Sequence, residues 1–362
     1  MTRLIKPYIQ YEDVEKEFKE VFETGLFTKG SYVHKFEDAL KKYTGAKFGY
    51  FTTSATTALT MALKVIDIKP GDEVIVSDFS FPATVNVVED LYATPIFADV
   101  DKETYNMNPV DLEKKITRKT KAIIFVDALG NPSGIHKIKA ICEKHGIPLI
   151  EDAACGLGSS ENGLKCGNIS DITCFSFHPR KLLTTGEGGA ILTNNKQYSE
   201  LLKVKLAHGA IVENGKFDFV DYGYNYRLPE LQSIMGIKQL VHLDDVIKRR
   251  QELKAAYVKE LITYGIIPQK VSSNVIHNVQ SAVFYVPQDI NRDELITYLR
   301  TKEIETTIGT YCLSGCSYYL KKYNSLQPVA NDLFMNTITL PCHDEVNYKE
   351  VCDAIIAFIE GK

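Results

Sequence analysis

The sequence lacks several features that would assign it to common protein classes. No apolar run is long enough to span a membrane, and the first residues lack the continuous apolar core of a signal peptide. The net charge is −4, which argues against binding nucleic acid through phosphate neutralisation. The eight cysteines form no CxxC pair, and several lie inside apolar runs. We therefore expect reduced thiols, no metal site, and a cytoplasmic protein that binds neither nucleic acid nor membranes.

Common cofactor and nucleophile motifs are also missing. The sequence has no GxGxxG, no P-loop, no HExxH and no GxSxG. The segment GLGSS at residues 156–160 lacks the third glycine and does not open the first strand–helix unit. What is present is an ordinary globular composition: 362 residues, 44% hydrophobic and 24% charged, long enough for about two domains.

Short β-rich runs alternate with helical patterns over the first 240 residues. Most of the runs are continuously apolar, which is typical of strands covered on both faces. The seven predicted strands are residues 48–51, 73–77, 95–100, 122–127, 148–152, 172–177 and 190–193. The sequence therefore predicts an α/β fold with a seven-stranded, mostly parallel sheet sandwiched by helices.

The helical patterns have recognisable ends. The helix that follows the first strand can be capped by Ser54 or Thr56, and the helix near residue 135 stops at Gly146. A long helical pattern begins at Leu228 and is predicted to connect the first domain to a second one. We expect a large domain over residues 1–245 and a smaller C-terminal α/β domain over residues 246–362.

Three features follow neighbouring strands, at the edge where ligands bind in such sheets. The segment TTSATTA at residues 52–58 opens a helix and could hold a phosphate, or it could be a simple helix cap. Asp152 ends an apolar run and could face a cofactor or be bonded to backbone amides. Lys181 lies in a loop, as a solvated charge or as an amine for carbonyl chemistry. Together they fit pyridoxal phosphate, which needs a lysine, an acid beside the ring nitrogen and a phosphate cradle.

The residues around these features resemble one family. The stretch SFHPRKLLTTGEGGAILTN resembles the lysine motif of the DegT/StrS nucleotide-sugar aminotransferases, which are fold-type I pyridoxal-phosphate enzymes. Further resemblance lies in residues 70–88, 95–109, 145–154, 223–240 and 340–346. The glycines at 186–189 would only let the chain turn back tightly into the next strand.

The resemblance implies roles for individual residues. Lys181 would form the Schiff base and Asp152 would pair with the pyridinium nitrogen. The residues implied in holding the rest of the cofactor are Ala55, Thr56 and Ser176 at the phosphate, Phe81 on the ring, and Asn225 from the other subunit of a homodimer. Phe81 could instead be core and Asn225 a turn residue.

Some positions depart from the family pattern. Cys155 stands where relatives carry Gln, Glu or His near the phenolic oxygen, and Ala55 replaces a glycine. Ser314 replaces a histidine in the loop that includes Tyr311 and that lines the sugar pocket in relatives. Arg227, Arg180 and Lys29 are candidates for the nucleotide diphosphate or a carboxylate.

The resemblance also implies the reaction. Relatives that dehydrate sugars carry histidine at the lysine position, so Lys181 favours amination. We expect transfer from L-glutamate to a nucleotide-linked keto-sugar, first of all a 4-keto-6-deoxyhexose, for surface glycan synthesis. The alternatives are a sugar dehydratase, a 3-keto-sugar or non-sugar aminotransferase, and a catalytically silent sensor or partner subunit.

Overall fold

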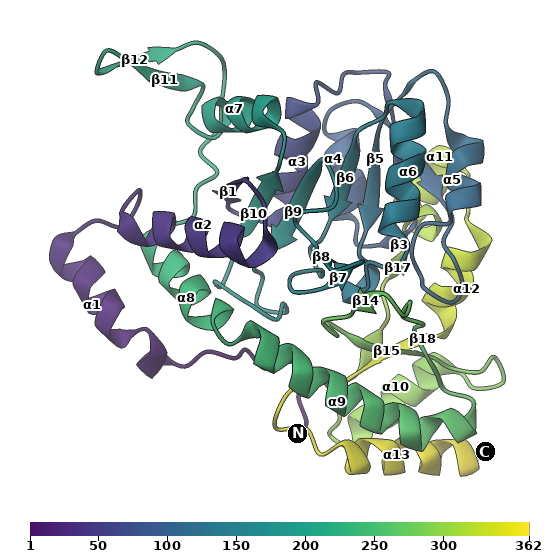
Figure 1. The fold of residues 1–362 in the computed structure, drawn as a ribbon. Coiled ribbons are helices and arrows are strands. Elements are labelled where there is room, and N and C mark those ends of the chain that lie inside the picture. Colours follow the sequence, from purple (N-terminus) through teal and green to yellow (C-terminus); the bar gives the residue numbers. More distant parts are fainter. Residues whose placement is uncertain (362) are drawn as a thin grey trace.

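The computed structural model describes residues 1–361. All seven predicted strands lie in one sheet, in the order β1-β10-β9-β6-β5-β2-β4 (Figure 1). Their bounds are β1 (Phe48–Thr52), β2 (Glu73–Ser77), β4 (Thr94–Ala98), β5 (Thr120–Val126), β6 (Leu149–Asp152), β9 (Ile172–Ser176) and β10 (Gly189–Thr193). Strand β10 is antiparallel to β1 and β9, and the remaining neighbours pair in parallel. The predicted mostly parallel sheet is confirmed.

Helices cover both faces of this sheet, which explains the continuous apolar runs. Val76 and Ile124 face the layer of α3 (Ala55–Val65), α4 (Ala83–Glu89) and α7 (Lys196–Lys205). Ile75 and Ile123 face the opposite layer, which contains α5 (Pro109–Lys115) and α6 (Ile135–His145). On that second face, α2 (Ser31–Thr44) and α8 (Glu230–Leu240) cover the end of the sheet that contains β1 and β10.

The helix ends follow the local sequence. Ser54, and not Thr56, caps α3, because its side chain accepts a hydrogen bond from the Thr57 N–H at 3.2 Å. Helix α6 ends at Gly146, which adopts a left-handed φ of 65°. The predicted stop at this glycine is confirmed.

The long helical pattern from Leu228 forms two helices. Helix α8 ends at Leu240, and α9 (Leu243–Leu261) begins after Val241 and His242. The predicted domain boundary between residues 245 and 246 falls inside α9, and the division stays a prediction.

A second sheet follows α9. It is antiparallel, in the order β13 (Ile267–Pro268), β15 (Ala282–Tyr285), β18 (Thr337–Leu340) and β16 (Thr307–Ile308). Helices α9, α10 (Arg292–Thr301) and α13 (Tyr348–Glu360) share one apolar core with it. In Figure 1, α9 and α13 run side by side below the large sheet.

Several elements were not predicted. A two-stranded hairpin, β11 (Ala210–Glu213) and β12 (Lys216–Phe219), projects from the body of the molecule beside α7 (Figure 1). Others include α1 (Glu15–Thr24), α11 (Ser317–Tyr323), α12 (Pro328–Asn336), the paired β3 (Phe79–Ser80) and β17 (Tyr311–Cys312), and the small sheet of β7 (Ser160–Glu161), β8 (Leu164–Lys165) and β14 (Val275–Ile276). Within residues 1–361, no helix has both the length and the apolar character needed to cross a membrane.

Candidate active site

Three strand ends meet at one corner of the large sheet. Thr52 at the end of β1 pairs with Gly189 at the start of β10, and Gly189 pairs with Ser176 at the end of β9. A side chain on Gly189 would collide with the first turn of α3: its Cβ would lie 2.4 Å from the Ser54 carbonyl carbon and 2.7 Å from the Ala55 nitrogen. The missing side chain therefore lets the start of α3 lie directly against the sheet.

This corner fits a phosphate group. The first turn of α3 presents backbone N–H groups and the positive end of the helix dipole. Strand pairing brings the predicted residues Ala55 and Ser176 to the same corner, and Thr56 is exposed one position further along the helix. Sequence reasoning gave the glycines only a turning role and missed the close approach at Gly189.

Asp152 is the last residue of β6 and is 5% exposed. Its Oδ2 accepts a hydrogen bond from the Thr84 hydroxyl at 2.8 Å, and its Oδ1 accepts one from the Ala154 N–H at 3.2 Å. Burial raises the pKa of Asp152, while these hydrogen bonds and the nearby charge of Lys181 lower it. A buried carboxylate of this kind is stabilised by a cationic partner, and a protonated pyridine nitrogen would be one.

Thr84 is a site residue that sequence reasoning missed. Its hydroxyl also lies 2.9 Å from the Ser80 hydroxyl, and both side chains are buried. The backbone N–H of Thr84 donates to the carbonyl of Phe81 at 3.1 Å. Asp152 is thus connected to the segment that carries Phe81. The sequence signal that could have identified Thr84 is its position three residues after Phe81, at the start of a helix.

Lys181 lies in the turn between β9 and β10, as predicted, and is half-buried. Its Nζ donates to the Cys155 Sγ at 3.1 Å. The backbone of Lys181 is fixed by a hydrogen bond to the His178 carbonyl at 2.8 Å. The amine, the thiol and the Asp152 carboxylate therefore lie together at the carboxyl ends of β6 and β9.

Phe81 is 64% exposed, so the alternative that it belongs to the core is wrong. Its ring meets Tyr311 edge-on, with the ring centroids 6.1 Å apart. Tyr311 is brought there by the pairing of β17 with β3, where Tyr311 lies opposite Ser80. The structure thus joins a predicted cofactor residue and a predicted substrate residue in one aromatic pair.

A buried acid anchors the loop that carries Tyr311. Asp78 accepts hydrogen bonds from the Ser314 N–H and hydroxyl, each at 2.7 Å, and from the Cys312 thiol at 3.2 Å. Burial raises the pKa of Asp78 to about 6, although these hydrogen bonds lower it. Ser314 is fully buried, so it holds the loop in place.

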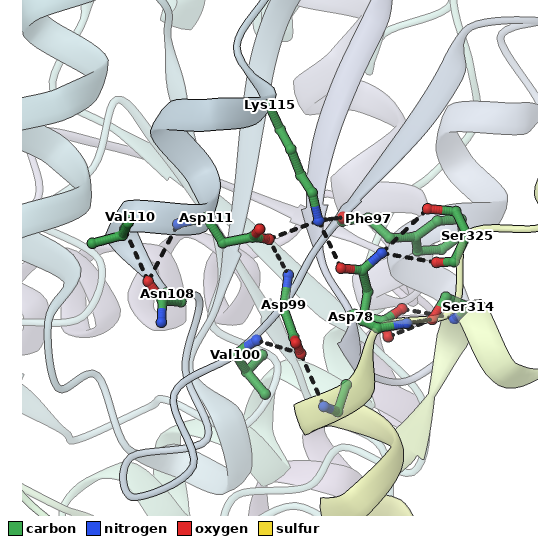
Figure 2. A network of polar contacts seen from close by, with 12 residues as sticks. Asp78, Phe97, Asp99, Val100, Asn108, Val110, Asp111, Lys115, Ser314 and Ser325 are labelled. Carbon is green, nitrogen blue, oxygen red and sulfur yellow. Dashed lines mark hydrogen bonds and ion pairs between the residues drawn. The ribbon is translucent and has the colours of Figure 1, made fainter.

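Further polar contacts attach the same segment to the large sheet (Figure 2). The Asp99 carboxylate accepts from the N–H groups of Val329 and Ala330 at the start of α12, at 3.1 and 2.9 Å. Lys115 forms an ion pair with Asp111 at 2.7 Å and donates to the Phe97 carbonyl and the Gln327 side chain. Figure 2 shows these groups between α5 and the C-terminal segment.

The remaining predicted residues lie apart from this cluster or at its edge. Asn225 is exposed, and its Oδ1 accepts from the Arg227 Nε at 2.6 Å. Arg180 is exposed beside Lys181. Lys29 lies next to Gly30 at the start of α2, where the buried Glu230 carboxylate accepts from the Gly30 N–H at 3.0 Å.

A second group of buried polar side chains lies behind Asp152. Asp127, Glu151 and Cys166 each place one potential metal-ligand atom within 4.8 Å of the others. Burial raises the pKa of Asp127 well above its usual value, and the adjacent Glu151 raises it further. The Glu151 Oε2 accepts from Thr173 at 2.7 Å, whereas the Asp127 oxygens have no partner within residues 1–361. The raised pKa favours the protonated, neutral form of Asp127 beside Glu151.

Comparisons with known proteins identify the family of this chain. A model of the DegT/DnrJ/EryC1/StrS aminotransferase family matches residues 9–359. The chain is 34% identical over 343 residues to the GDP-perosamine synthase of Escherichia coli O157:H7, which covers 94% of this chain and 93% of that protein. It is 30% identical over 348 residues to the UDP-2-acetamido-2-deoxy-3-oxo-D-glucuronate aminotransferase of Pseudomonas aeruginosa, covering 95% of both chains. The putative sugar aminotransferase Spr1654 from Streptococcus pneumoniae, solved in its PMP form, superposes with a TM-score of 0.93 at 25% identity over 99% of both chains.

Proposed function

Because this chain belongs to the DegT/DnrJ/EryC1/StrS aminotransferase family, and is therefore a pyridoxal-phosphate-dependent nucleotide-sugar aminotransferase, we propose that it moves the amino group of L-glutamate to a nucleotide-linked keto-sugar. The first candidate acceptor is a 4-keto-6-deoxyhexose, and the product would be an amino sugar for surface glycans. The observation that carries the proposal is the contact of Lys181 with Cys155 near Asp152, together with the start of α3 lying directly against the sheet at Gly189.

We assign the cofactor contacts as follows. The first turn of α3, from Ala55 and Thr56, holds the phosphate group with help from Ser176. Asp152 would hold the proton on the ring nitrogen, and Thr84 and Ala154 keep that carboxylate in position. The exposed ring of Phe81 would cover the face of the cofactor ring, and Cys155, in contact with Lys181, would lie near its phenolic oxygen.

The chain's own groups then move protons. When bound, pyridoxal phosphate supplies an aldehyde that accepts the amino group and a ring that withdraws electrons from the reacting carbon. Lys181 provides an amine that takes the proton from the carbon of glutamate and later returns a proton, acting as general base and general acid. Arg227, Arg180 and Lys29 are assigned to the negative groups of glutamate or the nucleotide, and Tyr311 to the sugar.

We further propose a homodimer in which Asn225 reaches the partner's cofactor phosphate. The hairpin β11–β12 supports an interface, because Val212, Phe217 and Phe219 are 64%, 72% and 68% exposed. Val212 lies opposite Phe217, and Phe219 follows two residues later, so the three side chains share one face of the ribbon. A two-stranded ribbon with such a face needs a surface to pack on. Eight free thiols are consistent with a place in the cytoplasm.

The first test is the visible absorption spectrum of the purified protein before and after addition of L-glutamate. We expect a yellow protein that glutamate bleaches, and a Lys181→Ala variant that does not respond. Lys196→Ala, at an exposed lysine, is the matched control and should behave as the wild type. A protein that stays colourless after addition of pyridoxal phosphate would contradict the proposal.

The acceptor is tested separately. Bleached protein is mixed with nucleotide-linked 4-keto-6-deoxyhexoses and nucleotide-linked 3-keto-sugars, and the amino product is measured by mass spectrometry. Return of the yellow colour with a 3-keto-sugar alone would replace the proposed acceptor. For the dimer, light scattering should give twice the chain mass, and Phe217→Ser should lower it while Tyr92→Ser, at another exposed aromatic residue, should not.

A further inference from the structure

The contact between Lys181 and Cys155 has chemical consequences of its own. The Lys181 Nζ donates to the Cys155 Sγ at 3.1 Å. Cys155 is partly exposed. A partly exposed thiol beside a cationic side chain is the usual environment of a reactive cysteine.

The other cysteines do not share this environment. Six of them are buried: Cys142, Cys166, Cys174, Cys312, Cys342 and Cys352. Cys316 is the other partly exposed cysteine, and its thiol donates to the Cys312 carbonyl at 3.4 Å. Burial raises the pKa of Cys316, and the nearby Asp78 adds to that effect. Cys316 is therefore a matched internal control.

The backbones on both sides of the contact are fixed. The Cys155 carbonyl accepts from the Asn278 side chain at 2.7 Å, and the Lys181 N–H donates to the His178 carbonyl at 2.8 Å. The lysine side chain is flexible, so closing the remaining distance between nitrogen and sulfur requires no movement of the sheet.

We propose that Cys155 and Lys181 form a peroxide-sensitive modification site, in which oxidation of the thiol joins its sulfur to the lysine nitrogen. Hydrogen peroxide first oxidises the thiol to a sulfenic acid and is reduced to water. Lys181 then gives up one proton to water and its nitrogen attacks the sulfur. The S–N bond forms, the S–O bond breaks, and the oxygen leaves as a second water with a proton from the attacking nitrogen. The chain loses two hydrogen atoms in total, and a thiol reductant reverses the reaction.

The consequence for activity rests on the proposed function. A Lys181 nitrogen bound to sulfur cannot hold the cofactor or move a proton. The site is therefore open to the modification only while the amine is free, and pyridoxal phosphate held by Lys181 protects it. Glutamate frees the amine in the proposed reaction, so glutamate should sensitise the enzyme to peroxide.

The test is intact-mass and peptide mass spectrometry of the full chain after treatment with hydrogen peroxide, with and without L-glutamate. We expect a species lighter by two hydrogen atoms, in which the peptides of Cys155 and Lys181 are joined, and its loss after dithiothreitol. Lys181→Ala should instead gain oxygen at Cys155 without a link. Cys316→Ser should still form the link, which distinguishes the sulfur–nitrogen bond from a disulfide between Cys155 and Cys316.

Two results would overturn the proposal: oxygen addition at Cys155 in the wild type without a link, or no reaction at Cys155 at all. Cys155→Ser should form no link, and Cys155→Ala gives the same control if the serine variant does not fold. The mass readout does not depend on colour. A protein that forms the Cys155–Lys181 link but never turns yellow would contradict the proposed function alone. A yellow enzyme that never forms the link would contradict this inference alone.

Discussion

A methyl group added at Gly189 tests whether the corner of β1, β10 and α3 is the phosphate cradle. The new Cβ of Gly189→Ala would lie 2.4 Å from the Ser54 carbonyl carbon and 2.5 Å from its oxygen. Carbon atoms in ordinary contact are about 3.5–4.0 Å apart, so strand and helix must separate by roughly 1 Å. Overpacking of this kind costs about 1–3 kcal/mol of unfolding free energy.

The same shift should weaken cofactor binding. A hydrogen bond to a charged group is worth about 1.5–3 kcal/mol, so loss of one phosphate contact lowers affinity roughly tenfold to a hundredfold. The matched control is Gly186→Ala, where φ is 83° and nothing lies within 4 Å of the new Cβ. That variant should lose about 1 kcal/mol of stability through its left-handed backbone and keep its cofactor affinity.

The measurements are urea unfolding for stability and equilibrium dialysis for pyridoxal phosphate affinity, with inorganic phosphate as competitor. If Gly189→Ala binds the cofactor as tightly as Gly186→Ala, the cradle does not lie at this corner. If both variants lose affinity equally, the effect comes from the turn and not from the contact with Ser54 and Ala55.

Three further predictions rest on buried polar groups. Thr84→Val removes a hydrogen bond to Asp152 and should weaken pyridoxal phosphate binding by about 1–2 kcal/mol in a spectroscopic titration, with Thr84→Ser restoring it; full affinity in the valine variant would refute the role. Burial lowers the pKa of Lys254 to about 8 from its usual 10.5, so its charge destabilises the fold below pH 8 and the cost fades towards pH 10.5. Lys254→Met should therefore unfold at higher urea at pH 7, by up to ~3 kcal/mol, and match the wild type near pH 10; a gain that is constant with pH would contradict this. Burial raises the pKa of Asp78 to about 6 from 3.8, so the wild type should lose stability relative to Asp78→Asn as pH rises from 4 to 6, and the difference should then stay level. A difference in urea-unfolding free energy that does not change between pH 4 and 6 would contradict the raised pKa.

The sheet could be predicted because its strands are buried on both faces and read as continuous apolar runs. The same topology made Lys181 and Asp152 predictable, because both follow strands at the carboxyl edge of the sheet. The family resemblance supplied Phe81 and Asn225, whose local sequences alone allowed other interpretations.

What could not be predicted depends on contacts between distant segments. Glu230 accepts hydrogen bonds from the N–H groups of Gly30, Tyr32 and Val33 and so caps a helix far away in the sequence. The role of Gly189 depends in the same way on the position of Ser54. The hairpin β11–β12 escaped prediction because its apolar residues are exposed within one chain, so no pattern of burial marks them.

The strand order of the large sheet also has a consequence for how the protein is made. Strand β1 lies at the edge, and its one neighbour in the sheet, β10, comes much later in the chain. During synthesis, the first turn of α3 therefore cannot pack against β10 until residues 189–193 have been made. Pairing between segments so far apart in the sequence forms slowly. A cofactor that binds where α3 meets β10 can do so only after β1 and β10 have paired. It therefore stabilises the finished chain by mass action and does not speed its assembly.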